Sequence, residues 1–175
     1  MSKTNPGRYF EDFRLGEVLA HATPRTLTAG DVALYTAFYG PRFALFSADS
    51  FAQNCGLGQS PVDPLVVFHM VFGKTVPDVS LNAVANLGYA DGRFLAPVHA
   101  GDTVSSRSEV IGLKENSNRK TGVVYVRTTG VNQHGTEVLI LLGCIGHHAG
   151  CSTVIEQFHP LRVRMLHTML NKPVT

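Results

Sequence analysis

The chain has 175 residues, a formal net charge of +2 at pH 7, 44% apolar residues and 16% charged residues. This length fits one domain that can bury a sizeable core, and the composition is that of a globular protein rather than a disordered one. The basic residues are scattered, apart from a small group between Lys114 and Lys120. We therefore expect no nucleic-acid partner, because such a partner needs a concentrated basic face.

The sequence offers no targeting or metal-binding pattern. No segment reaches the roughly 18 apolar residues of a membrane span, and residues 1–8 lack the apolar stretch of a signal peptide. The cysteines Cys55, Cys144 and Cys151 are odd in number and lack metal-site spacing. Cys55 is interpreted as a buried small hydrophobic residue, and His147-His148 as a solvated pair. These observations predict a cytoplasmic protein with reduced thiols, no membrane attachment and no metal.

The N-terminal part of the chain predicts a strand followed by a helix. Residues 17–25 have a strand-like pattern. Thr28 is suited to the N-cap position, and Asp31 adds favourable negative charge to the first turn. Apolar residues then recur at helical spacing until Gly40-Pro41 stops the helix.

The next part predicts a short helix within residues 43–56 and a second, strongly apolar helix. Pro61 and Pro64 bracket the start of the apolar helix, and proline suits a first turn because its missing amide would have no partner there. Residues 65–72 are apolar nearly all round the helix. A helix of this kind must be covered by other structure.

From Asn82 onward the pattern is that of β-strands. Alternating or β-branched segments are joined by short turns, and they cover residues 103–113, 122–129 and 136–145. Successive strands with short connections predict an antiparallel sheet. The fold class is therefore α+β, with a sheet curled around a central apolar helix.

Two adjacent motifs carry a resemblance to a known family. Residues 92–98 read Gly-Arg-Phe-Leu-Ala-Pro-Val, and residues 100–104 read Ala-Gly-Asp-Thr-Val. Together they resemble the arginine-phenylalanine, proline-valine and glycine-aspartate-threonine signature of MaoC-like hot-dog proteins. Further blocks stand in matching order, and the likeness covers about residues 5–139. The blocks at 5–13 and 71–78 are similar to mesaconyl-CoA hydratases in particular.

This resemblance implies a single hot-dog fold and acyl-coenzyme A chemistry. Mesaconyl-CoA hydratases interconvert mesaconyl-CoA and β-methylmalyl-CoA by reversible hydration, with coenzyme A as part of the substrate and no separate cofactor. Full-length members resemble two hot-dog units in tandem, and this chain has room for one. A single unit leaves a sheet edge open. We therefore expect a homodimer, or pairing with a second hot-dog unit.

The resemblance also locates the family's catalytic positions, and this sequence departs from them. Counting back without gaps from residues 50–52 places Pro41 at the usual Asp and Phe46 at the usual His. Counting forward places Asp63 at a second His, and Pro64 at the Gly whose amide stabilises the oxyanion. Pro41 and Phe46 cannot transfer a proton, and Pro64 has no N–H. We expect a half-unit that lacks the usual catalytic groups, so its status as an enzyme stays open.

Asp63 and His69 are the remaining catalytic candidates, and both have simpler interpretations. Asp63 falls at the mouth of the expected acyl pocket, but it is more simply a loop carboxylate, with Asp49 as a helix cap. His69 lies within the apolar helix, where a histidine is more often a packed core residue.

By position, the hot-dog resemblance implies which residues form the acyl and pantetheine cleft. They are Pro61, Val62, Asp63, Pro64, Asn86, Leu87, Gly88, Tyr89, Leu95, Ala96 and Pro97. For residues 95–97, a strand boundary is an equally good interpretation. Four polar residues could meet coenzyme A phosphates, or could serve solubility alone, namely Lys114, Asn116, Arg119 and Lys120.

The resemblance implies a hot-dog domain over residues 1–146 and an atypical tail over residues 147–175. After Leu139 the family pattern is lost, which a reading-frame change near that residue would explain. Residues 140–145 are apolar enough to complete a strand, so we expect the fold to persist and the end of the chain to be poorly packed.

Three functions remain open at this stage. The chain could be a unit of a hydratase for mesaconyl-CoA or another enoyl-CoA. It could instead be an acyl-CoA-binding or structural module without chemistry of its own. A hot-dog thioesterase is the third possibility, although the central helix offers no carboxylate beyond Asp63.

Overall fold

A computed structural model describes residues 6–22, 24–40, 43–148 and 157–158. The helical elements are η1 (Phe10–Asp12), α1 (Ala29–Tyr39), η2 (Ala44–Phe46), α2 (Asp49–Asn54), α3 (Pro64–Thr75) and the π-helical turn η3 (Val76–Ser80). The strands are β1 (Val18–Ala20), β2 (Arg25–Thr26), β3 (Ala83–Phe94), β4 (Thr103–Glu115), β5 (Thr121–Val131), β6 (Glu137–His148) and β7 (Gln157–Phe158). Among the helices in these ranges, none has the length and apolar character to span a membrane.

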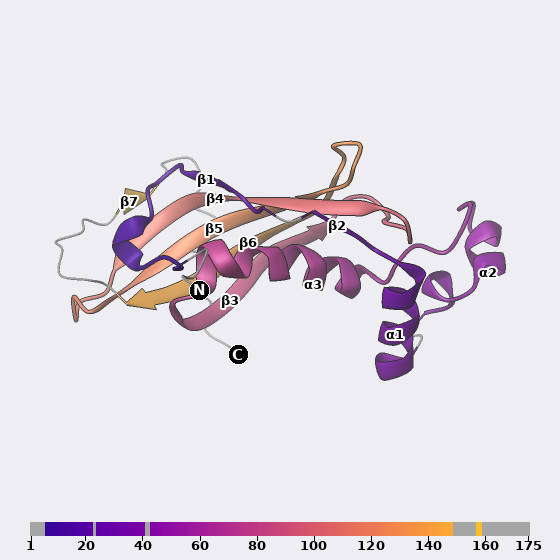
Figure 1. Cartoon of the computed structure of the whole chain (residues 1–175), viewed down its shortest axis with the longest axis horizontal. Coiled ribbons are helices and arrows are strands. Elements are labelled where there is room, and N and C mark those ends of the chain that lie inside the picture. The colour runs from indigo at the N-terminus through magenta and orange to yellow at the C-terminus, as the bar shows by residue number, and fades with distance from the viewer. Residues whose placement is uncertain (1–5, 23, 41–42, 149–156, 159–175) are drawn as a thin grey trace, which may run out of the picture.

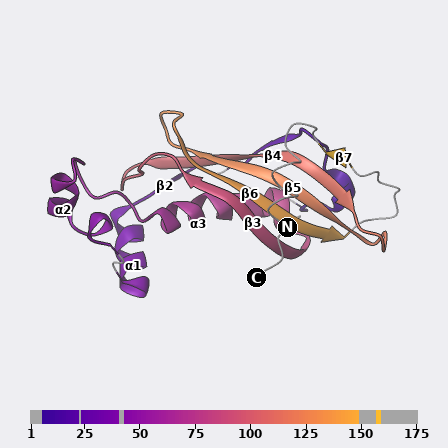
Figure 2. The same cartoon turned by 180° about the vertical axis from the view of Figure 1, so that it is seen from behind.

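Four long antiparallel strands form the body of the sheet, and α3 lies along one of its faces (Figures 1 and 2). The strand order is β1-β4-β5-β6-β3, and the short strands β2 and β7 also pair with β4. The predicted α+β fold, an antiparallel sheet around an apolar helix, is confirmed. Ranges were expected from sequence for β4, β5 and β6, and these strands extend one to three residues beyond them at four of the six ends, because the ladder continues through residues that lack a strong strand preference.

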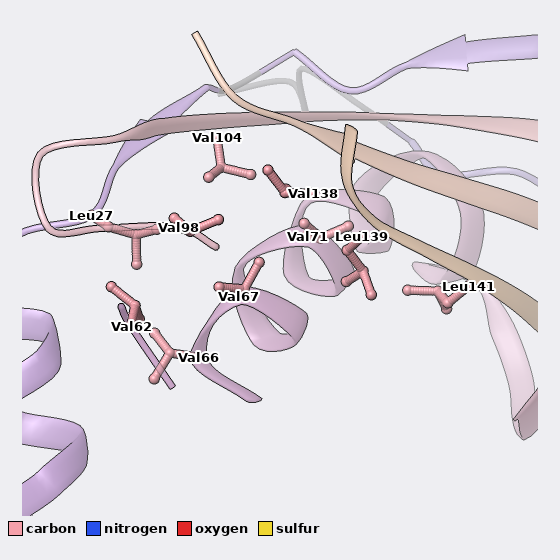
Figure 3. Close-up of a cluster of buried hydrophobic side chains, with 10 residues drawn as sticks. All are labelled: Leu27, Val62, Val66, Val67, Val71, Val98, Val104, Val138, Leu139 and Leu141. Atoms are coloured by element: carbon pink, nitrogen blue, oxygen red, sulfur yellow. The ribbon is translucent and has the colours of Figure 1, made fainter. Parts of the chain in front are cut away.

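The main core forms where the valine face of α3 meets the sheet. Val66, Val67 and Val71 are buried, and Figure 3 shows them directed towards side chains of the strands and connecting segments, namely Leu27, Val62, Val98, Val104, Val138, Leu139 and Leu141. Each fully buried side chain of this size contributes roughly 1.5–3 kcal/mol. Gly130 of β5 permits the close approach, since a Cβ there would lie 2.5 Å from Cγ2 of Val71.

A second core lies at the other end of the sheet. Phe10 and Phe13, from the N-terminal segment, pack there with Val79 of η3 and with apolar side chains of β4, β5 and β6. Gly122 of β5 leaves room for the Phe10 ring, which a Cβ at that position would approach to 2.4 Å. The N-terminal segment is therefore part of the folded domain.

A largely buried chain of hydrogen bonds joins η3, β4 and β5 to His21, the residue after β1. His21 Nδ1 lies 2.8 Å from Oδ2 of Asp78, and its Nε2 lies 2.8 Å from Oγ of Ser108. Ser108 Oγ is in turn 2.8 Å from Oγ1 of Thr128. Ser108 is fully buried, so no substrate can reach this serine-histidine-aspartate arrangement. Its role is to attach η3 to the sheet while satisfying buried polar groups.

Helix α1 begins and ends where the sequence predicts. Thr28 is the N-cap, with its Oγ1 accepting from the Asp31 N–H at 3.2 Å and the Asp31 carboxylate accepting from the Thr28 N–H at 2.9 Å. This reciprocal pair is a capping box. Gly40 ends the helix with a φ of 70°, a conformation that suits glycine.

Several apolar surfaces of the chain have no cover from the described residues. Helix α1 contains no buried residue, and with α2 it lies beyond the end of the sheet (Figure 1). Leu34, Phe38 and Tyr39 of α1 are exposed, as are Val84 and Leu87 of β3. The tertiary contacts of α1 include those of the partly buried Val32 and Tyr35 with the main core, and a short helix with few such contacts is marginal in water. These surfaces are typical of a unit that packs against another.

Two expectations about single residues are wrong. Cys55 is exposed, because it follows the end of α2 outside the core. His147 and His148 do not form a solvated pair, since alternation along β6 buries His147 completely and exposes only His148. The His147 ring packs against that of Phe13 at an interplanar angle of 58°, with 5.0 Å between ring centroids. Burial lowers the pKa of His147, an effect that backbone groups of Arg8 and Val79 partly offset.

We predict that acid weakens this fold through His147. The imidazole is neutral in both states above its unfolded pKa of about 6.5, so its contribution to stability is fully present there. As pH falls below that value, the unfolded chain takes up the proton more readily than the folded one, and the free energy of unfolding decreases. Urea unfolding at pH 7 and pH 5 should show a smaller decrease in a His147→Gln variant than in the wild type. A His148→Gln control should retain the wild-type decrease, and an unchanged pH dependence in His147→Gln would contradict this account.

Candidate functional site

An open cleft lies between the start of α3 and the segment that connects β3 to β4. Its volume is about 340 Å³. The cleft brings together six of the residues expected from sequence, namely Pro61, Val62, Pro64, Leu95, Ala96 and Pro97. Two interpretations of residues 95–97 agree with the structure. These residues line the cleft, and they follow the end of β3 at Phe94.

One backbone hydrogen bond joins the two walls of the cleft, and another attaches one wall to β6. The Val62 N–H donates to the Val98 carbonyl at 2.7 Å, and the Leu95 N–H donates to the Val138 carbonyl at 3.0 Å. Val62 and Val98 are also members of the main core. The prolines at 61, 64 and 97 restrict the backbone further. The cleft is therefore formed before any ligand binds.

Asp63 is the N-cap of α3 rather than a loop carboxylate. Its Oδ1 accepts a hydrogen bond from the Leu65 N–H at 2.8 Å, and its backbone carbonyl accepts from the Val66 N–H at 2.9 Å. Asp49, expected to be a cap, is instead the first residue of α2, and it accepts from the Ser60 N–H at 2.9 Å. Both interpretations are therefore wrong: Asp63 caps α3 because it precedes Pro64 at the first helical position, and Asp49 lies within the first turn of α2.

The first turn of α3 therefore has no N–H directed at a ligand. Pro64 has none, the Leu65 N–H is bonded to the Asp63 side chain, and the Val66 N–H is bonded to the Asp63 carbonyl. The partial positive charge of this helix end is also matched by the Asp63 carboxylate. An oxyanion at this point would meet a carboxylate and no free donor.

Phe46 forms an apolar wall where the resemblance would place a catalytic histidine. It lines the cleft together with Leu45 and Leu57, and its ring lies 6.1 Å from that of Phe43. Pro41, at the expected aspartate position, lies outside the described residues. Leu45, Phe46 and Leu57 were not predicted as cleft residues, because they come from the arm of η2 and α2 whose position depends on tertiary contacts.

His69 does not line the cleft. It is exposed on α3, about 7–8 Å along the helix axis from Pro64 given the ordinary helical rise. Its ring contacts Phe68 edge-on at 5.5 Å between centroids. The expectation of a packed core histidine is therefore wrong, because α3 is covered by the sheet on only one side.

Residues 86–89 lie beside the middle of α3 and do not reach the cleft. Tyr89 packs edge-on against Phe68 and Phe72, with centroid separations of 5.7 and 5.3 Å. Its hydroxyl accepts from the Asn86 amide, and burial raises the pKa of Tyr89. Leu87 is exposed at the sheet edge, and Gly88 has a φ of 148° at a register irregularity.

The residues proposed for coenzyme A phosphates lie at the opposite end of β4 from the cleft. Strand geometry places Lys114 about 36 Å from Thr103, at roughly 3.3 Å per residue. Asn116 is occupied within the hairpin, where its amide donates to Thr121 Oγ1 at 2.8 Å. The structure thus separates Lys114, Asn116, Arg119 and Lys120 from the cleft of the same chain. Their phosphate role stays a prediction.

A second, wider hollow adjoins the cleft. Its volume is about 700 Å³, and it lies between α1, the start of α2 and residues 59–62. Phe46, Pro61 and Val62 line both spaces. The sequence did not predict this hollow, because most of the residues that line it belong to no recognisable motif. In the described part of the chain, no three His, Cys, Asp or Glu side chains gather closely enough to hold a metal ion.

Comparisons with known proteins agree with this architecture. A family model for mesaconyl-CoA hydratase matches residues 2–143. A β-methylmalyl-CoA dehydratase from Chloroflexus aurantiacus is 65% identical over 138 residues, which are 79% of this chain and 39% of that protein. A solved structure described as a MaoC domain protein dehydratase from the same organism has a TM-score of 0.82 and 56% identity, covering 91% of this chain and 47% of that one. A Mycobacterium tuberculosis protein with a double hot-dog fold has a TM-score of 0.76 and 27% identity, covering 85% of this chain and 46% of that one.

The antiparallel sheet, its central helix and the cleft at the helix start define a MaoC-like hot-dog domain. Within that class the chain belongs to the mesaconyl-CoA hydratase family, since the family match covers most of its length at high identity. The chain spans about two fifths of the length of the curated relatives it matches.

The family match also bears on the C-terminal part of the chain. It ends at residue 143, close to the loss of resemblance expected after Leu139. Strand β6 nevertheless continues to His148, as the apolar residues 140–145 predict. Most of the proposed tail, residues 149–156 and 159–175, lies outside the described residues.

We predict that Asp63 stabilises the fold through the hydrogen bond by which its side chain caps α3. An Asp63→Ala variant should lose about 1 kcal/mol of unfolding free energy, the usual effect of removing an N-cap. An Asp63→Asn variant should be nearly unchanged, because asparagine is an equally good cap. Chemical denaturation of the three proteins measures both effects. A loss in Asp63→Asn as large as that in Asp63→Ala would show that the negative charge, and not the cap hydrogen bond, is what matters.

Proposed function

We propose that the chain is a substrate-binding half of a hydratase of the mesaconyl-CoA hydratase family and does not add water by itself. In this proposal the cleft at the start of α3 holds an acyl-CoA thioester. A second hot-dog unit supplies the groups that transfer protons. Coenzyme A enters as part of the substrate, and no separate cofactor is required.

The observation that carries the proposal is the occupied first turn of α3. Hydration of an enoyl thioester needs a group that activates water and a donor that stabilises charge on the thioester oxygen. In this turn Pro64 has no N–H, and the N–H groups of Leu65 and Val66 already donate to Asp63. Phe46 adds only an apolar wall. The cleft is therefore better suited to binding an acyl-CoA thioester than to catalysing its hydration.

The uncovered surfaces support pairing with a second hot-dog unit. β3 is the end strand of the sheet path, so one of its edges has no partner among the described strands. Val84, Leu87 and Phe94 are exposed along it. Unpaired edges of this kind readily accept another strand. The proposal also fits the two fifths of its relatives' length that this chain spans.

The alternatives are less well supported. A thioesterase would need a carboxylate or other nucleophile aimed into the cleft, and α3 contains neither Asp nor Glu. A purely structural module would not need a preformed cleft of about 340 Å³. A cytoplasmic location remains part of the proposal, and the free thiols of Cys55 and Cys144 are compatible with it.

We predict that the purified chain binds acyl-CoA but does not hydrate mesaconyl-CoA. Loss of the conjugated thioester absorbance measures hydration, and isothermal titration calorimetry measures binding. Turnover that disappears in an Asp63→Ala or a His69→Ala variant would overturn the non-catalytic assignment. A chain that binds no acyl-CoA would overturn the binding assignment instead.

We predict that the isolated chain forms a homodimer through the edge of β3. Sedimentation velocity at micromolar concentration should show a dimer for the wild type. A Val84→Asp variant should be largely monomeric, because it places a charge on that edge. A Val18→Asp variant is the matched control, since Val18 is similarly exposed, at 60% against 52%, on β1 at the other end of the strand order. A monomeric wild type, or equal effects of both variants, would contradict the prediction.

A further inference from the structure

Phe46 lies where the cleft at the start of α3 meets the wider hollow beside α1. The two spaces have volumes of about 340 Å³ and about 700 Å³, and they share three lining residues, Phe46, Pro61 and Val62. Phe46 also lines a small third space beside α1 and Asp63. We infer, on the basis of the proposed binding function, that the Phe46 ring ends the acyl site and so limits the length of the acyl group that the cleft binds.

Two of the three shared residues belong to the fixed frame of the cleft. Val62 is buried in the main core, and its N–H donates to the Val98 carbonyl at 2.7 Å. The ring of Pro61 restricts its own backbone. Phe46, in contrast, is half-buried in the three-residue turn η2 and belongs to neither core. Its side chain is therefore the part of the partition that can change size while the fold stays intact.

Neighbouring rings keep Phe46 in place. The ring of Phe43 lies edge-on to that of Phe46, with 6.1 Å between centroids, and edge-on to that of Phe51 at 5.7 Å. Edge-to-face pairs of this kind are attractive, because the positive edge of one ring meets the negative face of the other. Phe46 is thus anchored to α2 through Phe43 and acts as a fixed wall.

The hollow behind this wall suits an alkyl chain. Eight of its thirteen lining residues are apolar, and the largest group of them comes from α1. Ala29, Ala33 and Ala37 recur at every fourth position, which places them on one face of α1, and their small side chains leave the space open. Asp49 already accepts a hydrogen bond from the Ser60 N–H at 2.9 Å. Methylene groups that passed Phe46 would therefore gain apolar contact in this hollow.

The wall limits the length of the acyl group and not its charge. The mesaconyl group is short and branched, so a site that ends at Phe46 is compatible with the substrate of the family. Long-chain thioesters would instead leave their outer carbons in water. Their additional methylene groups would then add little to binding, because the gain comes from removing apolar surface from water.

Two straight-chain thioesters of different length test the role of Phe46. Calorimetry with the full chain gives the ratio of the affinities for dodecanoyl-CoA and hexanoyl-CoA. In the wild type this ratio should stay within about fourfold, the effect of a single buried methylene. In a Phe46→Ala variant it should be at least about tenfold larger, because the cleft and the hollow then form one space. An equal ratio in both proteins would overturn the inference, and so would a wild-type affinity that rises about fourfold with every added methylene.

Phe51→Ala is the matched control. Phe51 belongs to the same group of rings, but it lines neither space. The variant loosens the ring group and leaves the wall in place, so its affinity ratio should equal that of the wild type. An increase as large as that of Phe46→Ala would trace the effect to a loosened arm of η2 and α2 and overturn the inference.

A second substitution tests whether the added chain enters the hollow. Ala33 lines the hollow but not the cleft. Ala33→Phe alone should leave the wild-type ratio unchanged, because the ligand of the wild type does not enter that space. Combined with Phe46→Ala, it should remove most of the gain in dodecanoyl-CoA binding. A gain that persists in the double variant would locate the added chain elsewhere and contradict the inference.

Free coenzyme A separates failure of the inference from failure of the proposed function. If hexanoyl-CoA binds the wild type no more tightly than free coenzyme A does, the cleft is not an acyl site, and both are wrong. If hexanoyl-CoA binds more tightly than free coenzyme A while the ratios of wild type and Phe46→Ala are equal, the binding function stands and only the role of Phe46 is wrong.

Discussion

The packing of the valine face of α3 on the antiparallel sheet is the contact on which the rest of this structure depends. Val67 and Val71 enter a layer of side chains from the strands, and Gly130 lets the helix approach closely enough for that layer to close. The same contact places the start of α3 beside the segment between β3 and β4. The cleft is thus a by-product of core packing, and its walls share Val62 and Val98 with the core.

The residues that stabilise the helix start also occupy the N–H groups of its first turn. Asp63 and Pro64 form a strong helix entry, with a capping carboxylate and a proline at the first position. The same two residues remove the donors that an oxyanion needs. A good helix start and an oxyanion site compete for the same N–H groups, and in this chain the helix start has them. The outcome is a rigid apolar cleft suited to holding a ligand.

The apolar surfaces without cover among the described residues are typical of a domain that packs against another. Helix α1 has a well-formed capping box but no buried side chain, and β3 has an unpaired edge among the described strands. Capping residues can therefore define the ends of a helix whose stability depends on packing against other parts of the protein. The family match over residues 2–143 and the length of the relatives agree with a single unit of a larger architecture.

The sequence alone determined the fold class, the family and the ends of α1, because periodicity, capping residues and motif order are local properties. It also predicted that Pro64 cannot donate a backbone hydrogen bond to an oxyanion, since a missing N–H is a property of the residue itself. Tertiary structure decided which residues meet. It brought Leu45, Phe46 and Leu57 to the cleft, kept residues 86–89 and Lys114 away from it, and buried His147 while exposing His69. These outcomes depend on which side of a helix or strand another element covers, and that is settled only when distant segments pack together.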